Sequence, residues 1–89
     1  MFVLSQSGVA GLDAMGYDIN VQERQLQDGS IVRVFMIIGF GFGFNLLLGE
    51  YTIEEQARAV LTDIYVAMRN GEEFYDIREK EKKFVNRQS

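Results

Sequence analysis

One stretch of the chain, residues 53–69, has the apolar spacing of an amphipathic helix. Its apolar side chains recur at intervals of three and four residues: Ile53, Ala57, Val60, Leu61, Ile64, Tyr65 and Met68. Thr52 and Glu55 stand in the order of a capping box, which predicts that the helix begins directly after the threonine. Asn70 and Gly71 favour a left-handed stop at the other end. No other stretch of this length has the same spacing, so most of the remaining core has to come from strands.

Strand-like patterns occupy much of the rest of the chain. Residues 17–22 alternate apolar and polar side chains, and residues 31–38 form a second, more apolar run. Asp28 and Gly29 lie between these two runs and are a strong local signal for a hairpin. Further strands are predicted at residues 3–4, 45–51 and 74–77.

These patterns predict an α+β fold, a small antiparallel β-meander of about four to five strands with one amphipathic helix packed on one face. Because 89 residues leave room for one core, we predict a single domain over residues 1–77 and a charged C-terminal tail over residues 78–89. For residues 74–81 a strand and a short helix capped by Asp76 both remain open, and we favour the strand. The helix should pack on the sheet face that carries Ile19, Val21, Val34 and Leu46.

Composition excludes several kinds of chemistry. The chain has no cysteine and no histidine, which removes thiol nucleophiles, thiolate or imidazole metal ligands and histidine acid–base catalysis. The acidic pairs at residues 54–55 and 72–73 are explained by a helix N-terminus and by an exposed turn. We therefore predict that the protein is not an enzyme, and that it has no catalytic residues, no cofactor and no metal.

Charge and hydropathy limit the partners and the location. A net charge of −4 speaks against a protein that binds nucleic acid by neutralising phosphates. The apolar stretch at residues 34–48 is interrupted by Asn45 and is too short to span a bilayer. Residues 1–6 lack the pattern of an export signal. We expect a cytoplasmic protein with neither nucleic acid nor membrane as its partner.

The most unusual feature is the alternation of glycine and phenylalanine at residues 39–44. We predict a second hairpin that turns at residues 40–43, because glycine supplies the backbone angles of a reversal. The spacing does not fit a dinucleotide-binding loop, which must lead into a helix. Two interpretations stay open: the aromatic rings fold over the core, or they form an exposed surface for an oligomer or a partner.

The strand before this turn adds further residues to a predicted interaction surface. Arg33 interrupts an apolar strand face, and it either pairs with a cross-strand carboxylate or binds an anion at an interface. With one sheet face covered by the helix, nothing in so short a chain is left to cover the opposite face. The predicted surface consists of Arg33, Phe35, Ile37, Phe40, Phe42 and Phe44. We predict a non-enzymatic interaction protein, a homo-oligomer that self-associates through the hairpin of residues 31–48 and binds another protein.

Two segments of the chain resemble a group of small proteins found in Gram-positive bacteria and their phages. They are the start, Phe2-Val3-Leu4-Ser5-Gln6, and the strand-to-helix segment that opens with Leu48-Gly49-Glu50-Tyr51 and runs to Tyr65. The chain departs from that group at residues 39–44, where the group has a polar turn. The group has no assigned catalytic or binding residues, so the resemblance implies none. It suggests an alternative function, a phage-encoded inhibitor or small-ligand sponge that acts against a host system.

Overall fold

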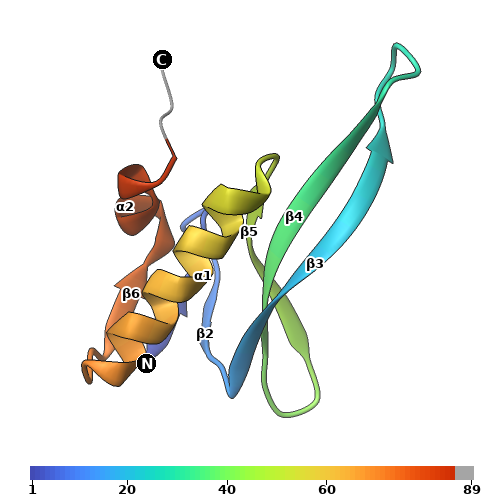
Figure 1. Cartoon of the computed structure of the whole chain (residues 1–89). Helices are drawn as coiled ribbons and strands as arrows, with labels where there is room; N and C mark the ends of the chain where they lie inside the picture. The colour runs from blue at the N-terminus through green and yellow to red at the C-terminus, as the bar shows by residue number, and fades with distance from the viewer. Residues whose placement is uncertain (86–89) are drawn as a thin grey trace.

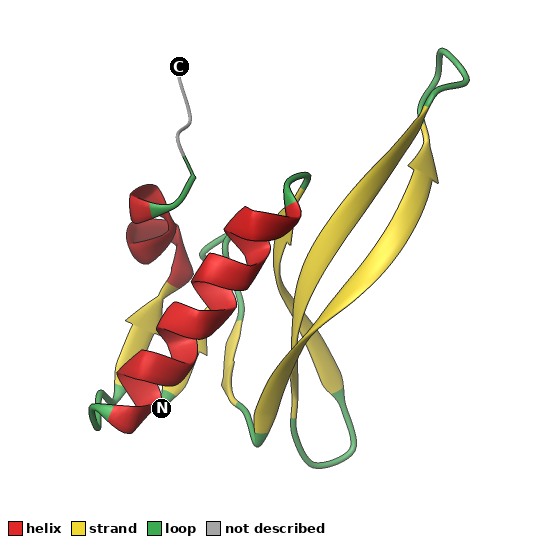
Figure 2. Cartoon of the chain, viewed as in Figure 1, coloured by secondary structure: helices red, strands yellow, loops and turns green. Residues whose placement is uncertain are grey.

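The computed structural model describes residues 1–85 of the chain and has an α+β fold with two sheets of three strands each (Figure 1). The first sheet has the strand order β2 (Gly11–Asp13), β1 (Phe2–Leu4) and β6 (Phe74–Asp76). The second has the order β3 (Gly16–Gln25), β4 (Ile31–Phe40) and β5 (Asn45–Tyr51). The helix α1 (Glu54–Arg69) follows β5, and the short helices α2 (Ile77–Lys80) and η1 (Glu81–Lys83) follow β6 (Figure 2).

The second sheet is the predicted antiparallel meander. Strands β3 and β4 are joined by the expected Asp-Gly turn, in which Gly29 has φ +88°. The Leu26 N–H donates to the Ser30 carbonyl at 2.8 Å, and the Asp28 carboxylate accepts from the Ser30 N–H at 2.9 Å. The bond to the Asp28 carboxylate stabilises the turn. The register of the two strands is set by the alternating apolar residues on either side of it.

The sequence predicts strands at β1 and β6 but neither β2 nor the separate sheet that the three strands form. Each of these strands is only three residues long, which is too short for alternation to show how it pairs. Strand β1 pairs antiparallel with β2 and parallel with β6. The parallel pairing requires a long crossover, and the chain supplies it with the whole meander and α1. The predicted single meander is therefore one of two sheets.

Helix α1 has the predicted stop but not the predicted start. At its C-terminus Gly71 has φ +77° and its N–H donates to the Met68 carbonyl at 3.0 Å, while the Glu72 N–H donates to Ala67 at 3.1 Å. This pair of bonds is a Schellman motif. At the N-terminus no side chain caps the helix and Ile53 is the N-cap residue. The predicted capping box at Thr52 is wrong, because the helix begins one residue later than that box requires.

One core lies between α1 and both sheets. The helix contributes Ala57, Val60, Ile64 and Ala67, and the sheets contribute Val3, Leu12, Tyr17, Phe35, Ile37, Leu48, Tyr51 and Tyr75. In the antiparallel register Ile37 lies opposite Ile19, whereas Val34 lies opposite Gln22 and so faces away from α1. The predicted sheet face was wrong for Val34. Both rows of β4 are apolar, so alternation alone could not show which row points inward.

Residues 77–83 are folded into two short helices rather than forming part of a solvated tail. Asp76 caps α2 by accepting from the Arg78 N–H at 3.0 Å, so β6 and the alternative capped helix both form, one after the other. Glu81 in η1 is 5% exposed. The predicted boundary at residue 77 therefore does not separate a folded core from a tail, and the last part of that tail, residues 86–89, lies outside the described residues.

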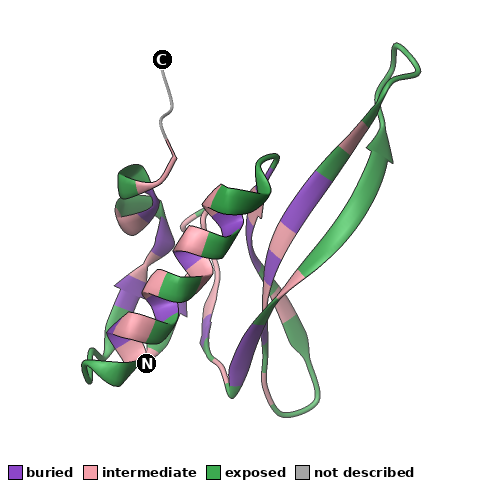
Figure 3. Cartoon of the chain, viewed as in Figure 1, coloured by how far each residue is buried: buried purple, intermediate pink, exposed green. Residues whose placement is uncertain are grey.

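The outer ends of β3 and β4 form an arm that projects beyond α1 (Figure 1). We call residues 20–33 the β3–β4 arm. Every residue from 20 to 31 is exposed, and Figure 3 shows the change from the buried base of the two strands to the exposed arm. Along β4 the buried residues stop at Val34, although the strand itself extends outward to Ile31.

Candidate interaction surface

The loop between β4 and β5, residues 40–44, is an exposed aromatic turn. The Gly41 N–H donates to the Phe44 carbonyl at 3.0 Å, and Gly43 has φ +82°. The Phe42 side chain is 86% exposed, and Phe40 and Phe44 are exposed as well. Of the two open interpretations of this turn, the structure excludes the one in which its rings fold over the core.

The aromatic turn is anchored at its first residue. The Phe40 ring lies against Gly16, where an added Cβ would come within 2.5 Å of a ring carbon. The Met15 N–H also donates to the Phe40 carbonyl at 2.8 Å. Met15 and Leu47, on the segments that flank the turn, are also exposed and extend its apolar surface. These contacts fix the base of the turn and leave its tip in solvent.

The six residues predicted as one surface lie in three places. Phe40, Phe42 and Phe44 form the aromatic turn. Phe35 and Ile37 are buried in the core against α1, so the prediction that they are uncovered is wrong. Arg33 lies on the exposed arm directly opposite Glu23, yet within residues 1–85 it forms no ion pair with that carboxylate or any other.

The outer edge of β5 is covered by a loop of the first sheet. The Gln6 N–H donates to the Leu48 carbonyl at 2.6 Å. The Gln6 side chain then acts as a further strand residue: its Oε1 accepts from the Glu50 N–H at 2.9 Å and its Nε2 donates to the Glu50 carbonyl at 3.3 Å. This edge is therefore closed to another strand around Leu48 and Glu50.

The outer edge of β3 is covered only at its base. The Tyr65 hydroxyl of α1 accepts from the Tyr17 N–H at 3.2 Å and donates to the Tyr17 carbonyl at 2.9 Å. The Ile19 N–H donates to the Asp18 carboxylate at 2.8 Å. Farther along the arm, no group within residues 1–85 forms a hydrogen bond to the outer edge of β3. Sequence reasoning missed this difference between the two edges, because Gln6 and Tyr65 are distant in sequence from the strands that they cover.

An ion pair crosses the outer face of the second sheet. The Arg24 Nη2 on β3 donates to the Glu50 Oε1 on β5 at 2.6 Å and passes over Met36 of β4, with its Sδ at 3.8 Å. The hydrogen bond to Glu50 raises the pKa of Arg24 further above its ordinary value. Both side chains are largely solvated, so the pair orders the Arg24 side chain more than it stabilises the fold.

Two carboxylates are held by tyrosine hydroxyls near the C-terminal helices. The Tyr51 Oη donates to Glu81 Oε2 at 2.7 Å, and the Gln6 Nε2 donates to the same oxygen at 3.0 Å. The Tyr75 Oη donates to Asp63 Oδ2 at 2.6 Å, and burial together with this carboxylate raises the Tyr75 pKa above its ordinary value. These bonds join η1 to β5 and β6 to α1, so both carboxylates serve to hold the C-terminal elements on the rest of the fold.

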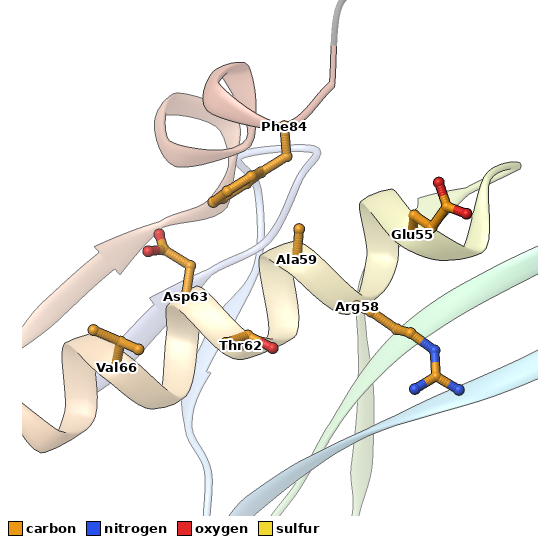
Figure 4. A pocket seen from close by; sticks show the side chains of 7 residues that line it. All are labelled: Glu55, Arg58, Ala59, Thr62, Asp63, Val66 and Phe84. Carbon is orange, nitrogen blue, oxygen red and sulfur yellow. The ribbon is translucent and has the colours of Figure 1, made fainter.

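A shallow apolar groove of about 500 Å³ runs along the outer side of α1 (Figure 4). It is lined by Glu55, Arg58, Ala59, Thr62, Asp63, Val66 and Phe84. Phe84 forms one wall, and the Arg58 side chain points away from it and pairs with Glu54 at 2.8 Å (Figure 4). The Asp63 carboxylate at its floor accepts from Tyr75 and also from the Lys83 Nζ at 3.2 Å. Two polar side chains of the groove, Arg58 and Asp63, are thus engaged with the protein itself.

Within the described part of the chain, no three carboxylates come together in a way that could hold a metal ion. No helix among residues 1–85 is both long enough and apolar enough to cross a membrane. The acidic pairs considered in the sequence are exposed, the first at the start of α1 and the second in the turn before β6.

No family model, no curated protein and no solved structure matches the chain. The resemblance to proteins of Gram-positive bacteria and their phages therefore stays a prediction. The geometry itself defines an α+β protein with two exposed features at opposite ends of β4, the aromatic turn and the β3–β4 arm.

Proposed function

We propose that the protein is a non-enzymatic interaction protein that self-associates and binds another protein, and that the aromatic turn is the surface for that other protein. The observation that carries the proposal is the exposure of Phe40, Phe42 and Phe44 on one short reversal. Exposed apolar clusters of this kind are typical of protein interfaces, and aromatic residues are enriched at the centres of such interfaces.

The local contacts of the aromatic turn favour the same function. Its closing hydrogen bond and the packing of Phe40 on Gly16 support the backbone of the turn without any partner. A surface that is already ordered loses less conformational entropy on binding than a mobile loop. Phenylalanine adds contact area at a small further cost in side-chain freedom.

The buried polar groups support a binding function over an enzymatic one. The two carboxylates shielded by the C-terminal helices, Asp63 and Glu81, already accept hydrogen bonds from Tyr75 and Tyr51. The groove along α1 brings no free acid and base together. Since the chain lacks histidine and cysteine, acid–base or nucleophilic catalysis would depend on groups of this kind.

A photo-crosslinking amino acid in place of Phe42 tests the proposal in cells that carry the gene. We expect a discrete product between this chain and one other protein. The matched control carries the same amino acid in place of Val9, an apolar residue that is 87% exposed in a loop of the first sheet. Identical products from both positions, or none from position 42, would contradict the proposal. A product of twice the mass of the chain would instead assign the turn to self-association.

A further inference from the structure

The outer side of α1 carries the apolar groove together with two charged residues. The side chains that face away from the core recur at intervals of four and three residues: Glu55, Ala59, Thr62, Val66 and Arg69. Ala59 and Val66 are half-buried, and the other members of this set are exposed. Figure 4 shows Glu55 at one end of the groove and Val66 toward the other. We call these residues the α1 seam.

The two charged ends of the α1 seam are not neutralised within the described part of the chain. Among residues 1–85, neither Glu55 nor Arg69 takes part in an ion pair. Glu54 and Arg58 lie farther round the helix, where they pair with each other at 2.8 Å. The seam therefore has a negative end and a positive end, which lie at equal sequence distances on either side of Thr62.

We propose that a second copy of this chain packs its α1 antiparallel in this groove, about a two-fold axis at Thr62. Each Glu55 then lies beside Arg69 of the other copy, so the interface carries two opposite-charge pairs related by the axis. The proposal rests on the self-association in the proposed function, and it names the surface and the register that self-association uses. It moves self-association away from the hairpin of residues 31–48, whose inner row is buried against α1.

Charge selects this arrangement among those in which two copies of α1 lie along each other. In a parallel pair, Glu55 would lie beside the Glu55 of the other copy, and Arg69 beside its Arg69. An antiparallel pair shifted by a full turn would leave one charge of each copy beyond the end of the partner helix, since Glu55 and Arg69 stand close to the two ends of α1. The antiparallel pair also sets the N-terminus of each helix beside the C-terminus of the other, which the helix dipoles favour.

The same register fills the groove with apolar side chains. Ala59 and Val66 lie at similar distances on opposite sides of Thr62, so Val66 of each copy lies beside Ala59 of the other. Phe84 stands beside Ala59 at the Glu55 end of the groove, which brings the Val66 of the other copy toward its ring. The aromatic turn is not part of the α1 seam and is left for a different protein.

Complementary charge reversals test the register. Glu55→Lys sets a lysine beside Arg69 of the second copy, and Arg69→Glu sets a glutamate beside Glu55. Each variant by itself should dimerise about tenfold more weakly than the parent, because two opposite-charge pairs become like-charge pairs. An equal mixture of the two variants restores both opposite-charge pairs. Sedimentation velocity and native mass spectrometry should then show a heterodimer of near-parental affinity and few homodimers.

Glu54→Lys is the matched control for the change of charge. It makes the same change in the same turn of α1, but Glu54 lies off the seam and pairs with Arg58 of its own chain. This variant should dimerise like the parent, and circular dichroism of all three variants should show the helix retained. A loss of dimer equal to that of Glu55→Lys would contradict the proposal, because the charge would then act on the helix and not on the interface.

A single cysteine tests the two-fold axis. The chain has no cysteine of its own and Thr62 is exposed, so Thr62→Cys adds one thiol without disturbing the core. On the axis this thiol meets the same thiol of the second copy, and oxidation with copper phenanthroline should join the two in a disulfide-linked dimer. Ser30→Cys, at the exposed tip of the β3–β4 arm, gives the rate for random collision and should crosslink more slowly.

Each outcome has a defined meaning. If the parent associates but the charge-reversed variants dimerise like Glu54→Lys, or Thr62→Cys crosslinks no faster than Ser30→Cys, α1 is not the interface and the proposed self-association stands. If the parent remains a monomer at every concentration up to the millimolar range, the proposed self-association and this interface both fail, and a different protein is left as the occupant of the groove. Binding of another protein at the aromatic turn is then judged by the crosslinking at position 42 alone.

Discussion

The two hairpins that share β4 differ in what supports them. The β3–β4 arm has a polar tip, two exposed faces and an open backbone edge. The β4–β5 hairpin has an apolar tip, but it packs on Gly16 at its base and has Gln6 along its outer edge. The strand between them is continuous. The difference shows that two hairpins sharing one strand can expose different groups, the backbone edge of β3 in the arm and aromatic side chains in the β4–β5 turn.

The largest expected loss of stability comes from Ile37 at the base of β4, and Ile31 on the arm is its control. Ile37 is 0% exposed at the base, and Ile37→Ala should lower the free energy of unfolding by about 2–5 kcal/mol. Ile31 is 67% exposed on the arm, and Ile31→Ala should change it by less than about 0.5 kcal/mol. Urea unfolding at a concentration where the chain is monomeric measures both. Equal losses would show that the arm packs on the core in solution.

The next prediction compares the stability contributed by a hydrogen bond in the core region, Tyr51 to Glu81, with that of the Tyr65 bonds at the base of the arm. Tyr51→Phe removes the hydroxyl that donates to buried Glu81 and should cost about 1.5–3 kcal/mol. Tyr65→Phe removes the hydroxyl that covers the β3 edge at Tyr17, a more exposed site, and should cost about 0.5–1.5 kcal/mol. Thermal unfolding of the two variants gives the order. The reverse order would mean that the β3 edge is the more strongly supported region.

A matched pair of glycines compares the two turns. Gly29 in the arm and Gly43 in the aromatic turn both have positive φ and no neighbouring atom within 4 Å. Alanine at either position meets only the backbone cost of that conformation, about 1–2 kcal/mol. We expect equal losses in the free energy of unfolding for Gly29→Ala and Gly43→Ala. A much larger loss at Gly43 would show that the aromatic turn contributes to the stability of the core that packs against α1.

The smallest effect is expected at the entry to α1. Because no side chain caps the helix, Thr52→Ala should change the free energy of unfolding by less than about 0.5 kcal/mol. A working capping box would give a loss of about 0.5–2 kcal/mol. A loss in that higher range by urea unfolding would show that Thr52 caps the helix in solution.

The parts of the fold that the sequence predicts are those set by neighbouring residues. The meander follows from alternation and the Asp28-Gly29 turn, and the end of α1 follows from Asn70-Gly71. The first sheet depends on contacts between segments far apart in the chain, so the strand patterns at residues 3–4 and 74–77 do not show that these two strands pair with each other. The inward row of β4 depends on where α1 lies, so alternation alone predicts the wrong face for Phe35 and Ile37.

The candidate surfaces divide in the same way. The aromatic turn is recognisable because glycine and phenylalanine alternate without interruption, although only the structure shows that its rings are exposed. The open edge of β3 has no sequence signal. It begins where the cover of Tyr65 on β3 at Tyr17 ends, and Tyr65 is distant from β3 in the sequence.

The parallel pairing of β1 with β6 has a consequence for how the chain is made. Phe2 lies beside Phe74, so the first strand has no neighbour on that side until the meander, α1 and β6 have all been synthesised. Closing so long a loop is slow compared with forming the local β3–β4 hairpin. During translation β1 therefore waits, with one edge unpaired, while the meander and helix can already associate. The docking of β6 beside β1 is the step that completes the first sheet.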